Sequence, residues 1–318
     1  MKKRYLLLFF ICTYSITLAQ QTERIVVYRD DPHDLYMNTD ADSTTLFYEK
    51  MVPAVKPIGV LVVLSGVGER VKETIEESRL SSAALRKGFI VIFPSINRSI
   101  SKHIHEHAFL DTIFKQVVKA HGVGRDRFVL GGFSGGGTVA LSYAEKANRE
   151  PGSTFVKPRA VFAVDPPLDY THIWKNSEKN IERGYSPVAV DESKWILGIY
   201  STEFGGSPSQ HPETYLKYSV FTYDDKDGGN AKYLVKTPVL IYTEPDILWQ
   251  MENRRRDYYD LNCADISAMI NLLRMKGNLQ AHMIVTYNKG IRPDGQRHPH
   301  SWSILDPEEC LDWIMGYM

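Results

Sequence analysis

Residues 127–141 read RFVLGGFSGGGTVAL, in which an apolar run leads into a serine between glycines and then into helix-forming residues. Gly132, Ser134 and Gly136 fit the pattern G-x-S-x-G, which is typical of a sharp strand-to-helix turn that exposes a serine side chain. Such a turn strains the serine backbone and leaves no room for side chains two residues before and after it. The following helix would direct backbone N–H groups toward an oxyanion beside the serine. Ser134 is therefore the candidate nucleophile.

The segments around this turn alternate between apolar runs and amphipathic stretches. Continuous apolar runs are typical of strands buried on both faces, and they occur at 59–64, 89–93, 128–133, 160–164 and 238–242. Further strands are expected at 24–29, 44–50 and 282–287, and helices at 73–87, 108–121, 265–276 and 307–315. This alternation predicts an α/β fold with a mostly parallel, eight-stranded-type sheet and helices on both faces.

One long segment, residues 170–235, interrupts the alternation. It is rich in aromatic, Ser, Pro and Gly residues and shows little periodicity, so we expect an irregular cap or lid inserted into the core. The core would then consist of residues 20–169 and 236–318. The aromatic side chains of the insertion either line a pocket or form a small core of their own.

The N-terminus has the pattern of a secretory signal peptide. Basic residues at 2–4 precede an apolar run at 5–12, and small residues near Ala19 precede a polar stretch. We expect cleavage after Ala19 and a secreted or periplasmic protein. No later segment is apolar enough to span a membrane.

The charge balance gives no indication of a nucleic-acid partner. The 318 residues contain 38 Lys and Arg against 38 Asp and Glu, and removal of the three basic leader residues leaves 35 against 38. A net charge near −3 does not favour binding to nucleic acid or to anionic membranes. Two cysteines remain, Cys263 and Cys310, which either pair with each other or stay as buried free thiols.

Ser134 requires a base, and the base requires an acid that orients it. Active groups of a parallel sheet gather at the carboxyl ends of the strands. Asp246 follows the run at 238–242 and is the favoured acid. Glu244 in the same loop and Asp165 after the preceding strand are the alternatives.

Two histidines lie in the loop between the last strand and the last helix. His300 is the favoured base, because it is nearer the closing helix and the following Ser-Trp can pack it in place. His298 is the alternative base. A His-x-His pair can also bind a metal, but no third ligand with suitable spacing follows.

The chain order of Ser134, Asp246 and His300, together with the strand pattern, resembles that of the α/β-hydrolase superfamily. The resemblance covers nearly the whole chain after the leader, apart from residues 170–235. In that family the acid commonly lies in a motif like H-G-x-x-D. Here residues 242–246 read YTEPD, which keeps the Asp and lacks the His-Gly.

The resemblance implies an oxyanion hole made by the N–H group of Gly135 and that of Gly66 or Val67. It also implies a serine hydrolase that cleaves a small-molecule carboxylic ester through an acyl-enzyme, with no metal or organic cofactor. A serine peptidase or amidase of the same fold and a non-catalytic, hydrolase-like binding protein are the alternatives.

A run of three arginines, Arg254 to Arg256, follows the loop that contains Asp246. The run either forms a solvated helix face or places one arginine at the border of the pocket, where it would attract an acidic group of the substrate.

Overall fold

Eight strands form one sheet at the centre of the computed structural model, which describes residues 22–31, 33–37, 45–98 and 100–318. The strands are β1 (Glu23–Tyr28), β2 (Leu46–Met51), β3 (Gly59–Leu64), β4 (Phe89–Pro94), β5 (Phe128–Phe133), β6 (Ala160–Val164), β7 (Val239–Thr243) and β8 (Ala281–Val285). Their order in the sheet is β1-β2-β4-β3-β5-β6-β7-β8. β2 runs antiparallel to β1 and β4, and the pairs from β4 to β8 are all parallel. The predicted mostly parallel α/β sheet is confirmed.

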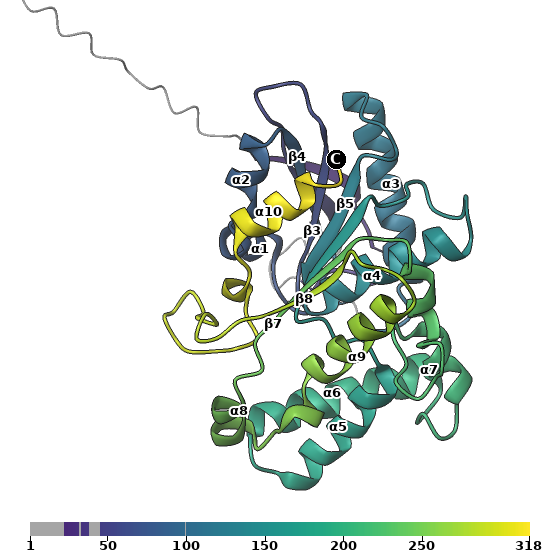
Figure 1. Ribbon diagram of the computed structural model, residues 1–318, viewed down its shortest axis with the longest axis vertical. Coiled ribbons are helices and arrows are strands. Elements are labelled where there is room, and N and C mark those ends of the chain that lie inside the picture. Colours follow the sequence, from purple (N-terminus) through teal and green to yellow (C-terminus); the bar gives the residue numbers. More distant parts are fainter. Residues whose placement is uncertain (1–21, 32, 38–44, 99) are drawn as a thin grey trace, which may run out of the picture.

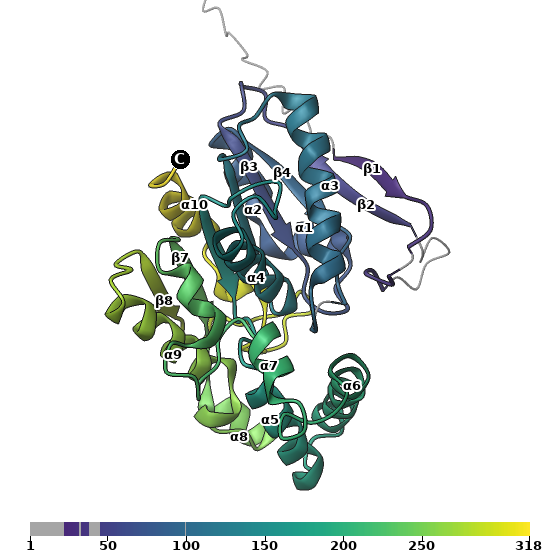
Figure 2. The same ribbon diagram turned by 90° about the vertical axis from the view of Figure 1, so that its right-hand side faces the viewer.

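Helices cover both faces of this sheet (Figures 1 and 2). One face carries α1 (Val71–Ser78), α2 (Leu80–Arg86) and α10 (Pro307–Met315), and the other carries α3 (Ile104–His121), α4 (Gly135–Arg149) and α9 (Asn262–Met275). All residues of β3, β4, β6 and β7 are buried, which explains why their sequences are continuous apolar runs.

The single helix expected at 73–87 is two helices. Arg79 adopts a left-handed conformation with φ of 55°, and this conformation ends α1 and starts α2. A non-glycine residue in this region interrupts the helical hydrogen bonding, and the apolar spacing alone does not reveal it.

The expectation of an irregular segment at 170–235 is wrong, because the structure is helical there. It contains α5 (Tyr170–Arg183), α6 (Pro187–Phe204), α7 (Pro212–Tyr218) and the 3₁₀ helix η1 (Gly229–Leu234). Figure 2 shows α5 and α6 beyond one end of the sheet. Their apolar positions are largely aromatic and pack against one another in a separate small core formed by Tyr170, Trp174, Tyr200, Phe204 and Tyr215 together with Ile100.

Each helix of this segment begins at a recognisable capping position. The Asp169 side chain accepts hydrogen bonds from two backbone N–H groups of α5, and Ser186 does the same once for α6. Pro187 and Pro212 each occupy the first turn of a helix, where proline is tolerated. The prolines that suggested loops are therefore helix starts.

After residues 170–235 the chain returns to the sheet with β7. It then forms α8 (Ile247–Arg254) and the 3₁₀ helix η2 (Tyr258–Asp260) before α9. A third 3₁₀ helix, η3 (Trp302–Ile304), precedes α10. The predicted signal peptide at 1–19 lies outside the described residues. Within the described residues, no helix has the length and apolar character needed to cross a bilayer.

Candidate active site

Ser134 occupies the turn between β5 and α4 with φ of 51° and ψ of −124°. This conformation is strained for a residue with a side chain. The neighbouring glycines are required by close contacts: a Cβ atom on Gly132 would lie 2.7 Å from the carbonyl oxygen of Leu64, and one on Gly136 would lie 2.6 Å from the same oxygen. The sequence-based expectation of a crowded, strained serine turn is confirmed.

Asp165 and His300 meet at the same edge of the sheet. Nδ1 of His300 lies 2.6 Å from Oδ2 of Asp165, and the imidazole ring packs against Phe133 with ring centroids 4.5 Å apart. An ionised carboxylate can only accept, so Nδ1 donates in this hydrogen bond. In the neutral imidazole, Nε2 is then the atom that can accept a proton.

Two further contacts hold Asp165 in place. Its Oδ1 accepts a hydrogen bond from Oγ1 of Thr243 at 2.7 Å, and its backbone carbonyl accepts one from Nδ2 of Asn262 at 2.9 Å. The Asp165 backbone itself is left-handed, with φ of 47°. Both oxygens of the carboxylate are therefore engaged, one by Thr243 and one by His300.

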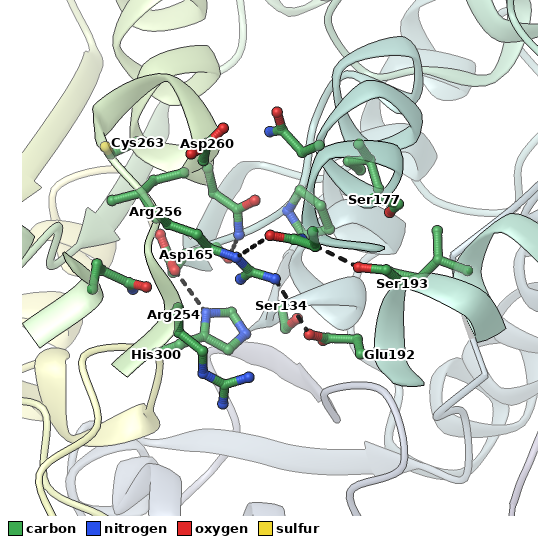
Figure 3. A pocket seen from close by; sticks show the side chains of 18 of the residues that line it. Ser134, Asp165, Ser177, Glu192, Ser193, Arg254, Arg256, Asp260, Cys263 and His300 are labelled. Carbon is green, nitrogen blue, oxygen red and sulfur yellow. Dashed lines mark hydrogen bonds and ion pairs between the residues drawn. The ribbon is translucent and has the colours of Figure 1, made fainter. Parts of the chain in front are cut away.

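Ser134, Asp165 and His300 line one cavity of about 400 Å³ (Figure 3). Its walls come from the strand ends and from the insertion, which contributes side chains of α5 and α6 such as Ile173, Trp195 and Ile196. A pocket of this volume is within the range of small-molecule sites.

Asp246, the acid favoured from the sequence, is not the partner of His300. Its Oδ1 caps α8 by accepting from the backbone N–H of Trp249 at 3.2 Å, and its Oδ2 forms an ion pair with Arg297. The structure brings Asp165, one of the two alternatives, against His300 instead. Asp246 is engaged by the Trp249 N–H and by Arg297, whereas Asp165, directly after β6, faces the histidine loop.

Glu244, the other alternative acid, is also directed elsewhere. Its fully buried side chain accepts hydrogen bonds from Oγ1 of Thr286 at 2.8 Å and from the N–H groups of Lys289 and Gly290 at 3.0 and 3.1 Å. It also pairs with Arg297. Glu244 thereby holds the start of the loop that carries His300.

His298 lines the same cavity but has no carboxylate partner in the described chain. Its Nδ1 donates to the backbone carbonyl of His300 at 2.9 Å, and its ring makes an edge contact with Trp249 at 4.9 Å between centroids. Burial lowers the pKa of His298 to about 3, and the positive charge of Arg292 acts in the same direction. Its hydrogen bond to the backbone carbonyl fixes the shape of the histidine loop.

The oxyanion candidates differ in availability. Gly135 opens α4, and an N–H group in the first turn of a helix has no intrahelical acceptor. The N–H of Gly66 donates to Oε2 of Glu69 at 2.7 Å, so it is occupied. Val67 lines the cavity, and its N–H has no hydrogen-bond partner within the described chain. Of the two residues left open from the sequence, the structure leaves Val67 available.

Glu69 was not identified from the sequence. Besides the bond to Gly66, its Oε1 accepts from Nε1 of Trp302 at 2.7 Å, so this carboxyl group joins the Gly66 turn to the segment just after His300. Burial raises the pKa of Glu69 to about 7. A glutamate three residues after a glycine turn carries no sequence signal for this role, because Trp302 is 233 positions away.

The two cysteines are separate. Cys263 and Cys310 are both buried free thiols, and burial raises the pKa of each. Of the two readings left open from the sequence, the structure shows free thiols. Among the residues that the structure describes, no group of three or more His, Cys, Asp or Glu side chains is arranged to hold a metal ion.

No model of a known protein family matches the chain, and no curated protein matches its sequence. Solved structures match its fold. Carboxyl esterase 2 from Tuber melanosporum is 12% identical with a TM-score of 0.57, covering 97% of this chain and 88% of its own. An S-formylglutathione hydrolase from Agrobacterium tumefaciens is 12% identical with a TM-score of 0.53, covering 93% and 95%.

A longer protein matches as well. The acylaminoacyl peptidase of Pyrococcus horikoshii is 13% identical with a TM-score of 0.55, covering 93% of this chain but 41% of the peptidase. These proteins are members of the α/β-hydrolase fold, and the likeness shows that the present chain has that fold. At such low identity, function has to be argued from the site.

Proposed function

We propose that the chain is a secreted serine hydrolase that cleaves carboxylic esters with Ser134 as nucleophile, His300 as base and Asp165 as orienting acid. The observation that carries the proposal is the 2.6 Å contact between His300 and Asp165 in the same cavity as the strained Ser134. The nucleophile and the acid directly follow β5 and β6, and the base lies in the loop after β8, at the edge where the active groups of a parallel sheet gather.

In the proposed reaction, Nε2 of His300 takes the proton of the Ser134 hydroxyl as its oxygen attacks the acyl carbon. The carbonyl oxygen becomes an oxyanion, which accepts from the N–H groups of Gly135 and Val67. His300 then gives the proton to the leaving alkoxide, and an acyl-enzyme remains. Water, activated by His300, attacks the acyl carbon and releases the acid and free Ser134. Asp165 stabilises the imidazolium in both halves.

A fluorophosphonate probe tests the nucleophile. We expect mass spectrometry to find the label on Ser134 in folded protein and to find none after Ser134→Ala. Turnover of p-nitrophenyl butyrate is expected to fall about 10³-fold or more in Ser134→Ala and in His300→Ala. His298→Ala is the matched control, with a much smaller loss. An unlabelled Ser134, or equal activity in the three variants, would sink the proposal.

An amide-cleaving enzyme is the second candidate, because one of the matched structures is an acylaminoacyl peptidase. A p-nitroanilide with the same acyl group as the ester separates the two. A higher kcat/KM on the anilide would favour the peptidase. A non-catalytic binding protein would react with neither substrate and would leave Ser134 unlabelled.

Secretion is tested separately. The leader predicts that protein recovered outside the cytoplasm begins at Gln20, which N-terminal mass analysis would show. Recovery of an intact Met1 in that fraction would overturn cleavage after Ala19.

A further inference from the structure

Three arginines line the cavity that contains Ser134: Arg254, Arg256 and Arg292. They come from the end of α8, from the segment after it and from the loop after β8. Figure 3 shows the Arg254 side chain next to His300 and the Arg256 side chain across the cavity toward Glu192. Two of the three arginines in the run noted in the sequence, Arg254 and Arg256, therefore border the candidate site.

The Arg256 side chain already interacts with other side chains of the protein. Its Nε donates to Oδ1 of Asn180 at 3.2 Å, and its guanidinium lies 3.8 Å from the Glu192 carboxylate. These contacts connect the segment after α8 to α5 and α6. The charge of Arg256 is balanced by protein groups, so it holds the wall of the cavity.

Arg254 and Arg292 are different, because neither has a carboxylate within 4.0 Å among the residues that the structure describes. Arg254 lies over the Trp249 ring at 6.0 Å. Burial lowers the pKa of Arg254 and the nearby charge of Arg292 lowers it further, whereas Glu192 acts in the opposite direction. Arg254 is half-buried and Arg292 is exposed, and both guanidinium groups line the cavity without an ion pair to any described carboxylate.

The other charged groups near the cavity do not remove this positive charge. Asp165 is engaged by His300 and Thr243. Asp260 pairs with Lys179 and Arg183, and Glu244 pairs with Arg297. The positive charge of Arg292 acts to lower the pKa of Glu77, but the two side chains form no ion pair. Like charges that line one pocket without ion pairs of their own are stabilised when an anion binds between them.

We propose that the cavity takes esters that carry a carboxylate on the acyl or the alcohol part, and that Arg254 and Arg292 bind this carboxylate. Guanidinium groups match carboxylates in geometry and charge. Glu192 faces the same cavity, so a monoanion is favoured over a phosphate dianion. This inference rests on the proposed esterase function and narrows its substrate class.

Matched pairs of esters test the inference and distinguish the two positions of the carboxylate. The acyl arm compares p-nitrophenyl hydrogen glutarate with p-nitrophenyl valerate, which has the same number of acyl carbons. The alcohol arm compares 4-carboxyphenyl valerate with its methyl ester. We expect kcat/KM to be about 10- to 100-fold higher for the anionic member of one pair, and 0.5 M NaCl to reduce this ratio.

The ratio is expected to fall toward 1 in the double variant Arg254→Gln, Arg292→Gln. Arg255→Gln is the control, because Arg255 is exposed, lies over Tyr185 at 4.7 Å and does not line the cavity. It removes one positive charge from the run that contains Arg254, and we expect it to leave both the ratio and the neutral-ester rate unchanged. A ratio of 1 in the wild-type protein for both pairs overturns the inference while the proposed function stands.

A binding measurement remains informative if no ester is cleaved. Calorimetry with the Ser134→Ala protein is expected to show binding of monomethyl glutarate, a monoanion, that weakens about 10-fold or more when Arg254 and Arg292 are replaced by Gln. Tighter binding of inorganic phosphate than of monomethyl glutarate, or no loss of affinity in the double variant, overturns the carboxylate site. Absence of both turnover and fluorophosphonate labelling instead overturns the proposed function.

Discussion

The ends of β6 and β7 both place carboxylates near the histidine loop, but they use them differently. At the end of β6, Asp165 directs its carboxylate to His300 and leaves the other oxygen to Thr243. At the end of β7, Glu244 and Asp246 both pair with Arg297. The first end forms the hydrogen bond that the proposed catalysis uses, and the second holds the start of the loop that carries His300. The same functional group therefore serves the reaction or the scaffold according to the donors that face it.

Replacing the two aspartates separately is the strongest test of this comparison. Asp165→Asn is expected to lower kcat/KM on a p-nitrophenyl ester by about 10²- to 10⁴-fold, because the amide favours the wrong imidazole tautomer. Asp246→Asn is expected to lower it by less than about threefold. Circular dichroism should show that both variants are folded. Equal losses in the two variants would contradict the assignment of Asp165.

Glu244 provides the corresponding test of stability. Glu244→Gln removes a fully buried carboxylate that accepts hydrogen bonds from Thr286, Lys289 and Gly290, so we expect a loss of about 2 kcal/mol in the free energy of unfolding. Asp246→Ala removes a helix cap and a partly exposed ion pair, so its loss should be about 1 kcal/mol. Urea unfolding measures both. A smaller loss for Glu244→Gln than for Asp246→Ala would show that Asp246, and not Glu244, contributes more to the stability of the loop.

The pH dependence of stability tests the role of the histidine loop, in which His298 packs against Trp249. Burial lowers the pKa of His298 to about 3, below its ordinary value of 6.5. The unfolded chain therefore binds a proton that the folded chain excludes, and this stability is present above pH 6.5 and lost as the pH falls toward 3.

Between pH 6.5 and 4, this effect should reach on the order of 2 kcal/mol, allowing for the partial exposure of the ring. His298→Gln is expected to unfold with a correspondingly shallower dependence on pH than the wild-type protein. Urea titrations at several pH values provide the measurement. Parallel curves for the two proteins would mean that His298 is not kept neutral by the fold.

The smallest expected effect concerns Thr243, whose side chain links the two strand ends. Thr243 is the last residue of β7, and its hydroxyl donates to Asp165 at the end of β6. Thr243→Val keeps the shape and removes the donor, so kcat should fall about 3- to 10-fold. KM is expected to change little, because Thr243 acts through Asp165. A change in KM alone would indicate that Thr243 contacts the substrate instead.

Sequence patterns were reliable where the physics is local. Buried parallel strands require continuous apolar runs, and the serine turn requires glycines where backbone atoms lie within 3 Å of a Cβ position. The patterns failed at 170–235, where aromatic residues that serve a separate small core obscured the helical period. They also missed the break at Arg79, since nothing in the apolar spacing marks a left-handed residue.

By itself, the sequence determined the α/β class, the position of Ser134 in a strand-to-helix turn and the two histidines that are candidates for the base. Only the tertiary structure identified Asp165 as the candidate acid, because Asp165 and His300 are 135 positions apart and meet only through the packing of the segments after β6 and β8. It also decided that the N–H of Gly66 is occupied, that the two thiols are unpaired and that Arg254 and Arg292 line one cavity. Steric requirements that act over short distances can be predicted from neighbouring residues. The partner of a side chain depends instead on how segments that are distant in the sequence pack together.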